Sequence, residues 1–472
     1  MFDIAIYIFL GIILLMLLLL TYYFPSLSKI KSQHEQDDKY TDEKGEKLSN
    51  FQGFIYTSIV LVVIAILVHT YFVVRNSPWE GHLSEWLNIA VRLMHITFGI
   101  AWIGASFYFV FLENALNRTK NVRDELAGNL WAIHGGGFYY LEKYKVAPKT
   151  VPKELHWFKY EAYFTWLSGF CLLFIVYYFN AQGFLIDPNV MKLTPAVAIS
   201  IGIGSLIVGW FIYDLLCKSS LSKNGFVFAL TGFVIAIGFA FFYTNVFSGR
   251  AAYIHFGALL GTIMAANVFF VIIPSQKAMV KAAKQGSDLD PALGRNAGFR
   301  SLHNNYLTLP VLFVMISNHF PSTFGYQYPW LLLAIISLGT VGVKHYLNLK
   351  EKGQFNVWVL PVSVLVLLGA AFISAPQKNL NACKPNVSIA QVYNIVQTRC
   401  ISCHSAKPTD ETLSAPPNGI SYETPQVIAR LKNEIMQRVV VTKTMPQNNK
   451  TGMTEEERNI IRCWIEQGAS IK

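Results

Sequence analysis

The sequence predicts an all-α protein, in which a polytopic helical membrane domain of about ten transmembrane helices precedes a small all-α domain. Of its 472 residues, 53% are apolar and only 14% are charged, whereas an ordinary soluble domain has about 25% charged residues. So few charges cannot cover a water-soluble fold, so most of the chain must face lipid. Apolar runs of membrane length end near residue 375, and about 96 polar residues follow them, enough for one small domain.

A helix needs about 20 apolar residues to cross a bilayer. The segments that meet this requirement are 4–24, 54–74, 85–112, 162–182, 195–217, 225–246, 251–273, 304–320, 328–347 and 355–374. The eighth is the shortest and contains Pro310, which predicts a kinked or re-entrant segment. The first lacks a preceding basic residue and a small-residue cleavage site, so it is predicted to be a retained anchor.

Basic residues are distributed unevenly between the predicted loops. Alternate loops contain 23 Lys and Arg, at 25–53, 114–161, 218–224, 274–303 and 344–354. The opposite loops contain only Arg75, Lys192 and Arg250. Because cytoplasmic loops carry the excess of Lys and Arg, both termini are predicted to lie outside. The net charge of +11 is therefore mainly a topology signal, and no nucleic-acid partner is expected.

Two local features complete the pattern of the loops and the tail. Three consecutive glycines from Gly135 predict a tight turn, and with it a short hairpin, in the 118–159 loop. In the tail, 388–398 is amphipathic, and Thr454 with Glu457 forms a capping box that opens a final helix ending at Gly468.

The tail contains the run Cys400-Ile401-Ser402-Cys403-His404. Two thiols at this spacing reach the vinyl groups of one haem, and the adjacent imidazole ligates the iron. The alternatives are a redox dithiol or half of a zinc site, but neither a thioredoxin-like strand nor a second ligand pair accompanies the motif. The tail is therefore predicted to be a cytochrome c with covalent haem c bound through Cys400 and Cys403.

The second iron ligand is predicted to be a methionine thioether opposite His404. Met445 is favoured because it lies in a loop and Pro446 fixes the backbone beside it. Met453 is the next candidate, whereas Met436 lies in a helical run where an apolar side chain is usually core. Cys383 and Cys463 flank the domain and could form a disulfide or remain as free thiols.

The third apolar segment has a polar face. Arg92, His95, Gly99, Trp102, Ser106 and Glu113 recur at helical spacing and share this face. Ionisable residues inside a membrane are costly and are functional candidates. Gly99 is expected to leave room on the face for a flat group.

His95 and His255 are expected at similar depth on different helices. They could ligate a b-type haem, line a substrate pocket, or form structural hydrogen bonds. Nearer the cytoplasmic side, Arg300, His303 and Asn304 belong to a dense polar cluster that could bind an anion or cap a helix. Asn267 could orient a ligand or bond a neighbouring helix.

From residue 85 onward the chain resembles the membrane-bound urate oxidase (urate hydroxylase) family with a fused C-terminal cytochrome c domain. The stretches that carry the resemblance are 92–95, 102–109, 134–139, 156–162, 255–267, 303–306, 400–404 and Met445-Pro446. The first 84 residues depart from the family pattern, because they add two helices to the eight that the resemblance accounts for. The expected units are 1–84, 85–375 and 376–472.

The resemblance implies a multi-pass enzyme of the bacterial inner membrane that oxidises urate to 5-hydroxyisourate in purine catabolism. Electrons would leave through haem c in the periplasm to a respiratory-chain acceptor, a soluble cytochrome or a terminal oxidase, instead of producing hydrogen peroxide. Because urate is an anion, a guanidinium such as that of Arg92 is a reasonable clamp. The candidate site residues are Arg92, His95, His255, His303 and Asn304.

A competing interpretation is an electron-transfer subunit without urate chemistry, in which the membrane helices carry b-type haem or quinol and the tail passes electrons onward. The His95 helix is weakly similar to small membrane haem proteins, which keeps this alternative open. A transporter with an accessory cytochrome is a third, less favoured possibility.

Overall fold

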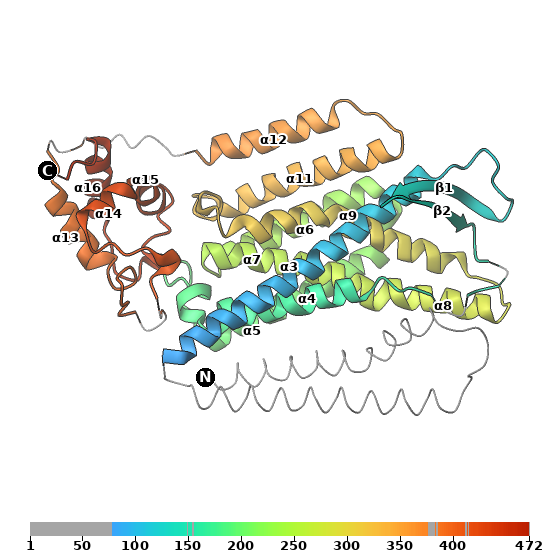
Figure 1. Cartoon of the computed structure of the whole chain (residues 1–472), viewed down its shortest axis with the longest axis horizontal. Helices are drawn as coiled ribbons and strands as arrows, with labels where there is room; N and C mark the ends of the chain where they lie inside the picture. Colours follow the sequence, from blue (N-terminus) through green and yellow to red (C-terminus); the bar gives the residue numbers. More distant parts are fainter. Residues whose placement is uncertain are drawn as a thin grey trace.

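The computed structural model describes residues 78–148, 150–152, 155–375, 383, 386–410, 413 and 415–471. These residues form a helical bundle with a small helical C-terminal domain at one end and a β-hairpin at the other (Figure 1). The predicted segments 4–24 and 54–74 lie outside the described residues. The all-α prediction holds for both parts, apart from the hairpin.

The bundle begins with α3 (Pro78–Ala115), which packs against α4 (Tyr160–Leu173). From α4 the chain continues through the π-helical turns η1 (Phe174–Tyr178) and η2 (Ala181–Leu185). The remaining helices are α5 (Pro195–Lys218), η3 (Ser220–Lys223), α6 (Gly225–Thr244), α7 (Gly249–Ala266), η4 (Asn267–Ile272), α8 (Ile273–Lys284), α9 (Pro291–Ser317), α10 (Pro321–Phe324), α11 (Pro329–Glu351) and α12 (Val359–Ile373).

Six helical stretches in the described part of the chain are long and apolar enough to cross a membrane. They are His82–Ala115, Tyr160–Tyr178, Pro195–Lys218, Gly225–Thr244, Gly249–Lys284 and Pro329–Glu351. α12 is apolar but shorter, and α9 is not among the six. Large apolar side chains such as Phe226 and Leu365 are exposed on these helices, which is the pattern expected of a surface that faces lipid.

Two helices begin earlier in the chain than the predicted apolar segments, because N-cap residues precede those segments. α9 begins at Pro291 rather than near residue 304, because Asp290 accepts the Ala292 N–H and proline is tolerated in the first turn. The helix also continues through Pro310 to Ser317. Arg250, assigned to a loop by its charge, lies in the first turn of α7 after the Ser248 cap.

Lys344 was likewise counted in a cytoplasmic loop, but it is completely buried within α11. Its Nζ lies 3.3 Å from the centroid of the Phe107 ring and has no hydrogen-bond partner among the described residues. A cation–π contact with Phe107 therefore stabilises the Lys344 ammonium group inside the protein, whereas a lysine in a loop would expose this group to water.

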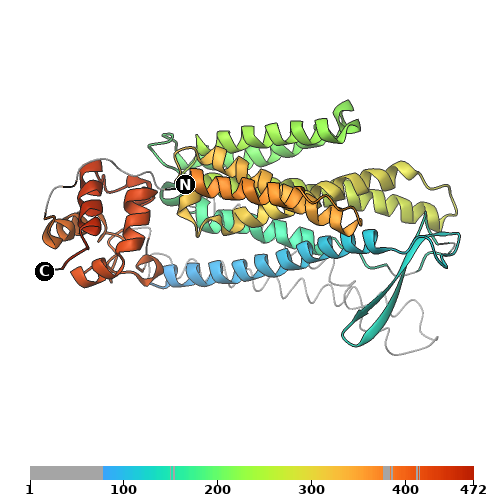
Figure 2. The ribbon, with the colours of Figure 1, turned by 90° about the horizontal axis from the view of Figure 1, so that it is seen from above.

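The hairpin predicted around Gly135 is present. Strands β1 (Leu126–His134) and β2 (Gly137–Tyr144) pair antiparallel and project from the end of the bundle (Figure 2). Gly135 and Gly136 have φ of 57° and 80°, and a two-residue turn of this hand needs positive φ at both positions. Glycine is the residue that adopts this backbone without strain.

The C-terminal domain has its own apolar core. Its elements are α13 (Ile389–Arg399), η5 (Pro417–Gly419), α14 (Pro425–Arg430), α15 (Lys432–Ile435), η6 (Met436–Val441), η7 (Gln447–Asn449) and α16 (Glu455–Glu466). The predicted capping box is confirmed, because Thr454 and Glu457 each accept the other's backbone N–H. A disulfide between Cys383 and Cys463 ties the start of the domain to α16, with a Cα–Cα distance of 5.3 Å.

Replacing both disulfide cysteines, as in Cys383→Ser/Cys463→Ser, should lower the stability of the C-terminal domain by about 2–4 kcal/mol, because the unfolded chain regains the freedom of a long loop. Hydrogen-exchange protection of α16 measures this loss. Reductant should weaken protection in the wild type to the same level and leave the variant unchanged. Equal protection in the wild type and the variant would contradict the prediction.

Candidate functional site

Two arginines meet at the end of the bundle nearest the C-terminal domain. Arg92 lies on α3, and Arg250 lies in the first turn of α7. Between them are Tyr177 of η1 and Asn318, which follows α9. The Tyr177 hydroxyl and Arg250 Nε both donate to Asn318 Oδ1, at 3.3 and 3.2 Å. These four residues are called the arginine cluster below.

The arginine cluster carries two positive charges that no carboxylate neutralises within the described residues. Arg92 interacts electrostatically with Arg250, and among the described residues its hydrogen-bond acceptor is Asn88 Oδ1, at 2.9 Å. The Arg250 guanidinium carbon lies 6.0 Å from the centroid of the Tyr177 ring. The amino-terminal turn of α7 adds partial positive charge from its free N–H groups. The cluster is therefore suited to bind an anion.

Accessibility differs across the cluster. Arg92 is exposed and Arg250 is half-buried, whereas Tyr177 is only 2% exposed. The guanidinium groups therefore form the accessible side and the phenol forms the buried side.

His95 lies one turn after Arg92 and faces α4. Its Nδ1 lies 3.0 Å from the Thr165 carbonyl oxygen and 3.2 Å from Ser168 Oγ. Nε2 has no hydrogen-bond partner among the described residues. The space predicted beside Gly99 is taken by α4, because a Cβ at Gly99 would lie 3.9 Å from Thr165 Cγ2. That part of the helix face is packed, and it leaves no room for a flat group.

His255 is fully buried and uses both ring nitrogens. Nδ1 is 2.8 Å from the Ala251 carbonyl oxygen, and Nε2 is 3.0 Å from the Tyr178 hydroxyl. Both ring nitrogens therefore have hydrogen-bond partners among the described residues. The membrane haem remains a prediction, and the geometry assigns His255 a packing role.

His303 and Asn304 lie in a second polar cluster, toward the hairpin end. The His303 Nδ1 is 2.7 Å from the Tyr213 hydroxyl, and its ring stacks on Phe228 with centroids 4.6 Å apart. Asn304 donates to the Met264 carbonyl oxygen and accepts from Asn267, at 2.9 and 2.8 Å. Both predicted site residues are thus occupied by contacts within the protein.

A buried arginine in the second cluster has a carboxylate partner, Asp214, which also pairs with Lys218. Arg300 is 2% exposed and pairs with Asp214 Oδ1 at 2.6 Å, and it also donates to Asn267 Oδ1 at 3.3 Å. His303 lies within α9, and Asn318 directly follows the helix. The two residues are therefore about 22 Å apart along the helix axis. The five candidate residues therefore do not form one site: Arg92 and His95 lie near one end, and His303 and Asn304 near the other.

Arg250, Tyr177 and Asn318 were not among the residues predicted for the site. Arg250 was counted with the loop charges because it precedes the predicted 251–273 segment, whereas the structure places it in the first turn of α7, after the Ser248 N-cap. An arginine just inside a helix N-terminus is electrostatically unfavourable, which could have marked it. Tyr177 and Asn318 gave no comparable signal, because their grouping depends on how three helices pack.

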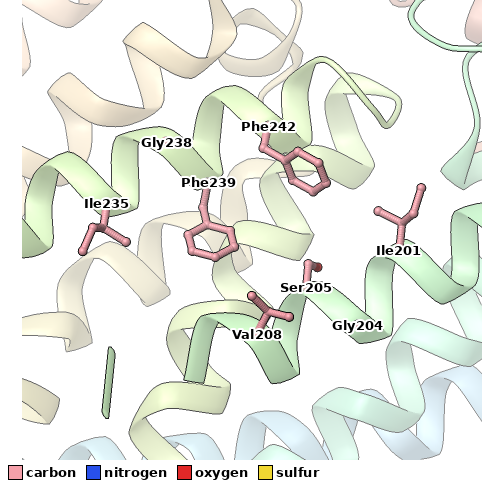
Figure 3. A pocket seen from close by; sticks show the side chains of 8 residues that line it. All are labelled: Ile201, Gly204, Ser205, Val208, Ile235, Gly238, Phe239 and Phe242. Carbon is pink, nitrogen blue, oxygen red and sulfur yellow. The ribbon is translucent and has the colours of Figure 1, made fainter. Parts of the chain in front are cut away.

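The groove between α5 and α6 is a poor candidate for a polar substrate (Figure 3). Its lining is apolar except for Ser205. The Ser205 hydroxyl already donates to the Gly202 carbonyl oxygen and accepts from Tyr243, at 2.7 and 2.9 Å. Val208 and Phe242 of the lining are exposed, so in a membrane the groove would face lipid.

In the C-terminal domain, the residues predicted to bind haem c are arranged compatibly with it. Cys400 and Cys403 are free thiols, and Cys400 and Met445 pack on the same apolar core. The His404 Nδ1 lies 3.0 Å from the Ile420 carbonyl oxygen, which fixes the ring and leaves Nε2 free among the described residues. An iron-ligating histidine typically uses its second nitrogen in this way. Met453, the other candidate, is 3% exposed within the core.

Burial shifts the ionisation of two side chains of this motif. It raises the pKa of the Cys400 thiol to about 12 and lowers the pKa of His404. Among the described residues no cluster of three or more His, Cys, Asp or Glu is placed to hold a metal ion.

Comparison with known families identifies the bundle. A family model described as urate oxidase N-terminal matches residues 81–375. The chain belongs to this family. The family region contains the whole arginine cluster and ends before the C-terminal domain. Membership indicates urate-related oxidation and therefore an oxidoreductase. No curated protein and no solved structure matches the chain.

The close contact of α5 with His255 gives a test of its packing role. A Cβ at Gly202 would lie 2.7 Å from the Tyr178 hydroxyl and 2.9 Å from His255 Nε2, whereas one at Gly204 would meet nothing within 4 Å. Gly202→Ala should therefore destabilise the protein by about 1–3 kcal/mol, measured as a lower Tm in detergent. Gly204→Ala is the matched control and should not lower the Tm. Equal Tm values for the two variants would refute the arrangement.

Proposed function

We propose that the protein oxidises urate to 5-hydroxyisourate at the arginine cluster and passes the electrons to haem c in its own C-terminal domain. The observation that carries this proposal is the pair of uncompensated guanidinium groups of Arg92 and Arg250 inside a domain of the urate oxidase N-terminal family. Haem c supplies a one-electron acceptor when it is bound.

The chemistry of urate matches the cluster. Urate is a planar anion whose oxygens accept hydrogen bonds, and a guanidinium is a planar donor that binds such edges in a bidentate manner. Arg92 and Arg250 would bind the charge, and the Asn318 amide would hold one edge. The Tyr177 ring, held against Arg250, would limit the depth of entry.

The reaction removes two electrons and two protons from urate as one water molecule adds to the purine ring. Loss of electrons makes the ring electrophilic, so the protein must hold the ring and admit water. His95 lies one turn from Arg92. Its Nε2 has no hydrogen-bond partner among the described residues, and the contact with the Thr165 carbonyl fixes its ring. We assign His95 as a candidate proton acceptor.

The residues proposed to hold the haem are those of the tail motif. Cys400 and Cys403 would form the thioether links, and His404 and Met445 would ligate the iron. A His-Met pair raises the reduction potential, which suits an electron carrier. The acceptor beyond this domain would be a soluble cytochrome or a terminal oxidase of the respiratory chain.

The proposed location is the bacterial inner membrane, with the C-terminal domain in the periplasm. The asymmetry of Lys and Arg between the loops supports this orientation. The Cys383–Cys463 disulfide supports it independently, because disulfides persist in oxidising compartments. Haem c attachment on that side of the membrane is consistent with both.

Arg92→Gln and Arg250→Gln should each raise the KM for urate about tenfold to a hundredfold, because a charged hydrogen bond to the anion is lost. The measurement is steady-state urate oxidation with an artificial electron acceptor. Lys192→Gln is the control: it removes an exposed positive charge from the 186–194 loop, which lies at the same end of the bundle. Unchanged KM values in both arginine variants would remove the arginine cluster from the site.

Met445→Ala should lower the midpoint potential of the haem, because a thioether ligand to the iron is lost. Met453→Leu should leave the potential within error, because its side chain packs in the core. Potentiometric titration of the purified full-length variants measures both. The reverse pattern would transfer the ligand role to Met453.

A further inference from the structure

The loop after Met445 contacts the membrane domain directly. Gln447 Nε2 and Asn448 Nδ2 both donate to the Gly183 carbonyl oxygen, and Asn448 Nδ2 also donates to the Ile186 carbonyl oxygen at 2.7 Å. In return, Asn189 Nδ2 donates to the Asn448 carbonyl oxygen at 3.2 Å. These contacts are called the amide junction below.

The membrane side of the amide junction is a helix end. Gly183 lies within η2, and Ile186 follows it directly. Carbonyl groups in the last turn of a helix lack intrahelical donors, and the two side-chain amides supply them. Asn448 reaches both carbonyls from a left-handed backbone, with φ of 52°.

The same turn also contacts the arginine cluster. Phe184, next to Gly183, places its ring centroid 5.8 Å from the Arg250 guanidinium carbon. Ser248, the N-cap of α7, donates to the Phe184 carbonyl oxygen at 2.7 Å. One five-residue turn, η2, therefore separates the arginine cluster from the loop that carries Met445.

A second contact between the C-terminal domain and the membrane domain lies at Gly325. A Cβ at Gly325, just after α10, would lie 2.8 Å from both the Cβ and the carbonyl oxygen of Thr442. Thr442 directly follows η6, and the Met445 N–H donates to the Arg438 carbonyl oxygen in η6 at 3.0 Å. The segment that carries Met445 therefore contacts the membrane domain at both ends, through Thr442 on one side and through Gln447 and Asn448 on the other.

We propose that Gln447 and Asn448 are positioning residues that hold the Met445 loop on η2, so that electrons cross from the arginine cluster in one docked arrangement. The inference rests on the proposed function. Urate and water give 5-hydroxyisourate, two protons and two electrons. Haem c, held by Cys400, Cys403, His404 and Met445 when bound, would take these electrons one at a time and pass each of them to a one-electron acceptor.

The test uses the full-length protein with haem c in detergent and follows anaerobic haem reduction after rapid mixing with urate. In Gln447→Ala/Asn448→Gly, the rate should fall about tenfold, because the docked arrangement loses its hydrogen bonds. Glycine keeps the left-handed backbone unstrained. The midpoint potential and full reduction by dithionite should stay unchanged, which a general loss of haem-domain structure would not allow.

Asn386→Gly is the matched control, because Asn386 has φ of 59°, is exposed, and forms no side-chain hydrogen bond within the described residues. It should reduce at the wild-type rate. Asn189→Ala tests the junction from the membrane side and should slow reduction by a smaller factor. A wild-type rate in the double variant would overturn the inference. A wild-type protein that urate does not reduce would overturn the proposed function, and the inference with it.

Discussion

The arginine cluster holds two positive charges for which the described residues offer no counter-charge. Arg92 and Arg250 come from different helices, and the described residues offer them only amide and aromatic partners. In a medium of low dielectric, such repulsion costs free energy that packing elsewhere must offset. A bound anion would convert the repulsion into attraction, and this difference is the physical basis of the proposed site.

The second polar cluster shows the contrast. Arg300 is more deeply buried than either arginine of the arginine cluster, but it is paired with Asp214, and its amide neighbours bond to one another. A buried pair of this kind pins helices together and fixes their register. Burial of an ionisable residue therefore does not by itself identify function in this protein. The presence or absence of a neutralising partner is the more informative property.

Much of the fold follows from local sequence signals. The capping box at Thr454 and the turn at Gly135 act over a few residues, so the structure agrees with what their sequences predict. The haem motif is equally local. The arginine cluster is not local, because it depends on where α3, η1, α7 and the end of α9 meet. Charge counting even misassigned Arg250, since a basic residue in the first turn of a helix resembles a loop residue in sequence. The Cys383–Cys463 pairing, left open by the sequence, required the same knowledge of packing.

The most direct test of the proposed urate site is an electron cryomicroscopy map of the full-length protein in a lipid nanodisc with saturating urate. We expect planar density in contact with the guanidinium groups of Arg92 and Arg250, absent from a map without urate. Urate density elsewhere, for example beside Arg300 and Asp214, together with an empty arginine cluster, would contradict it.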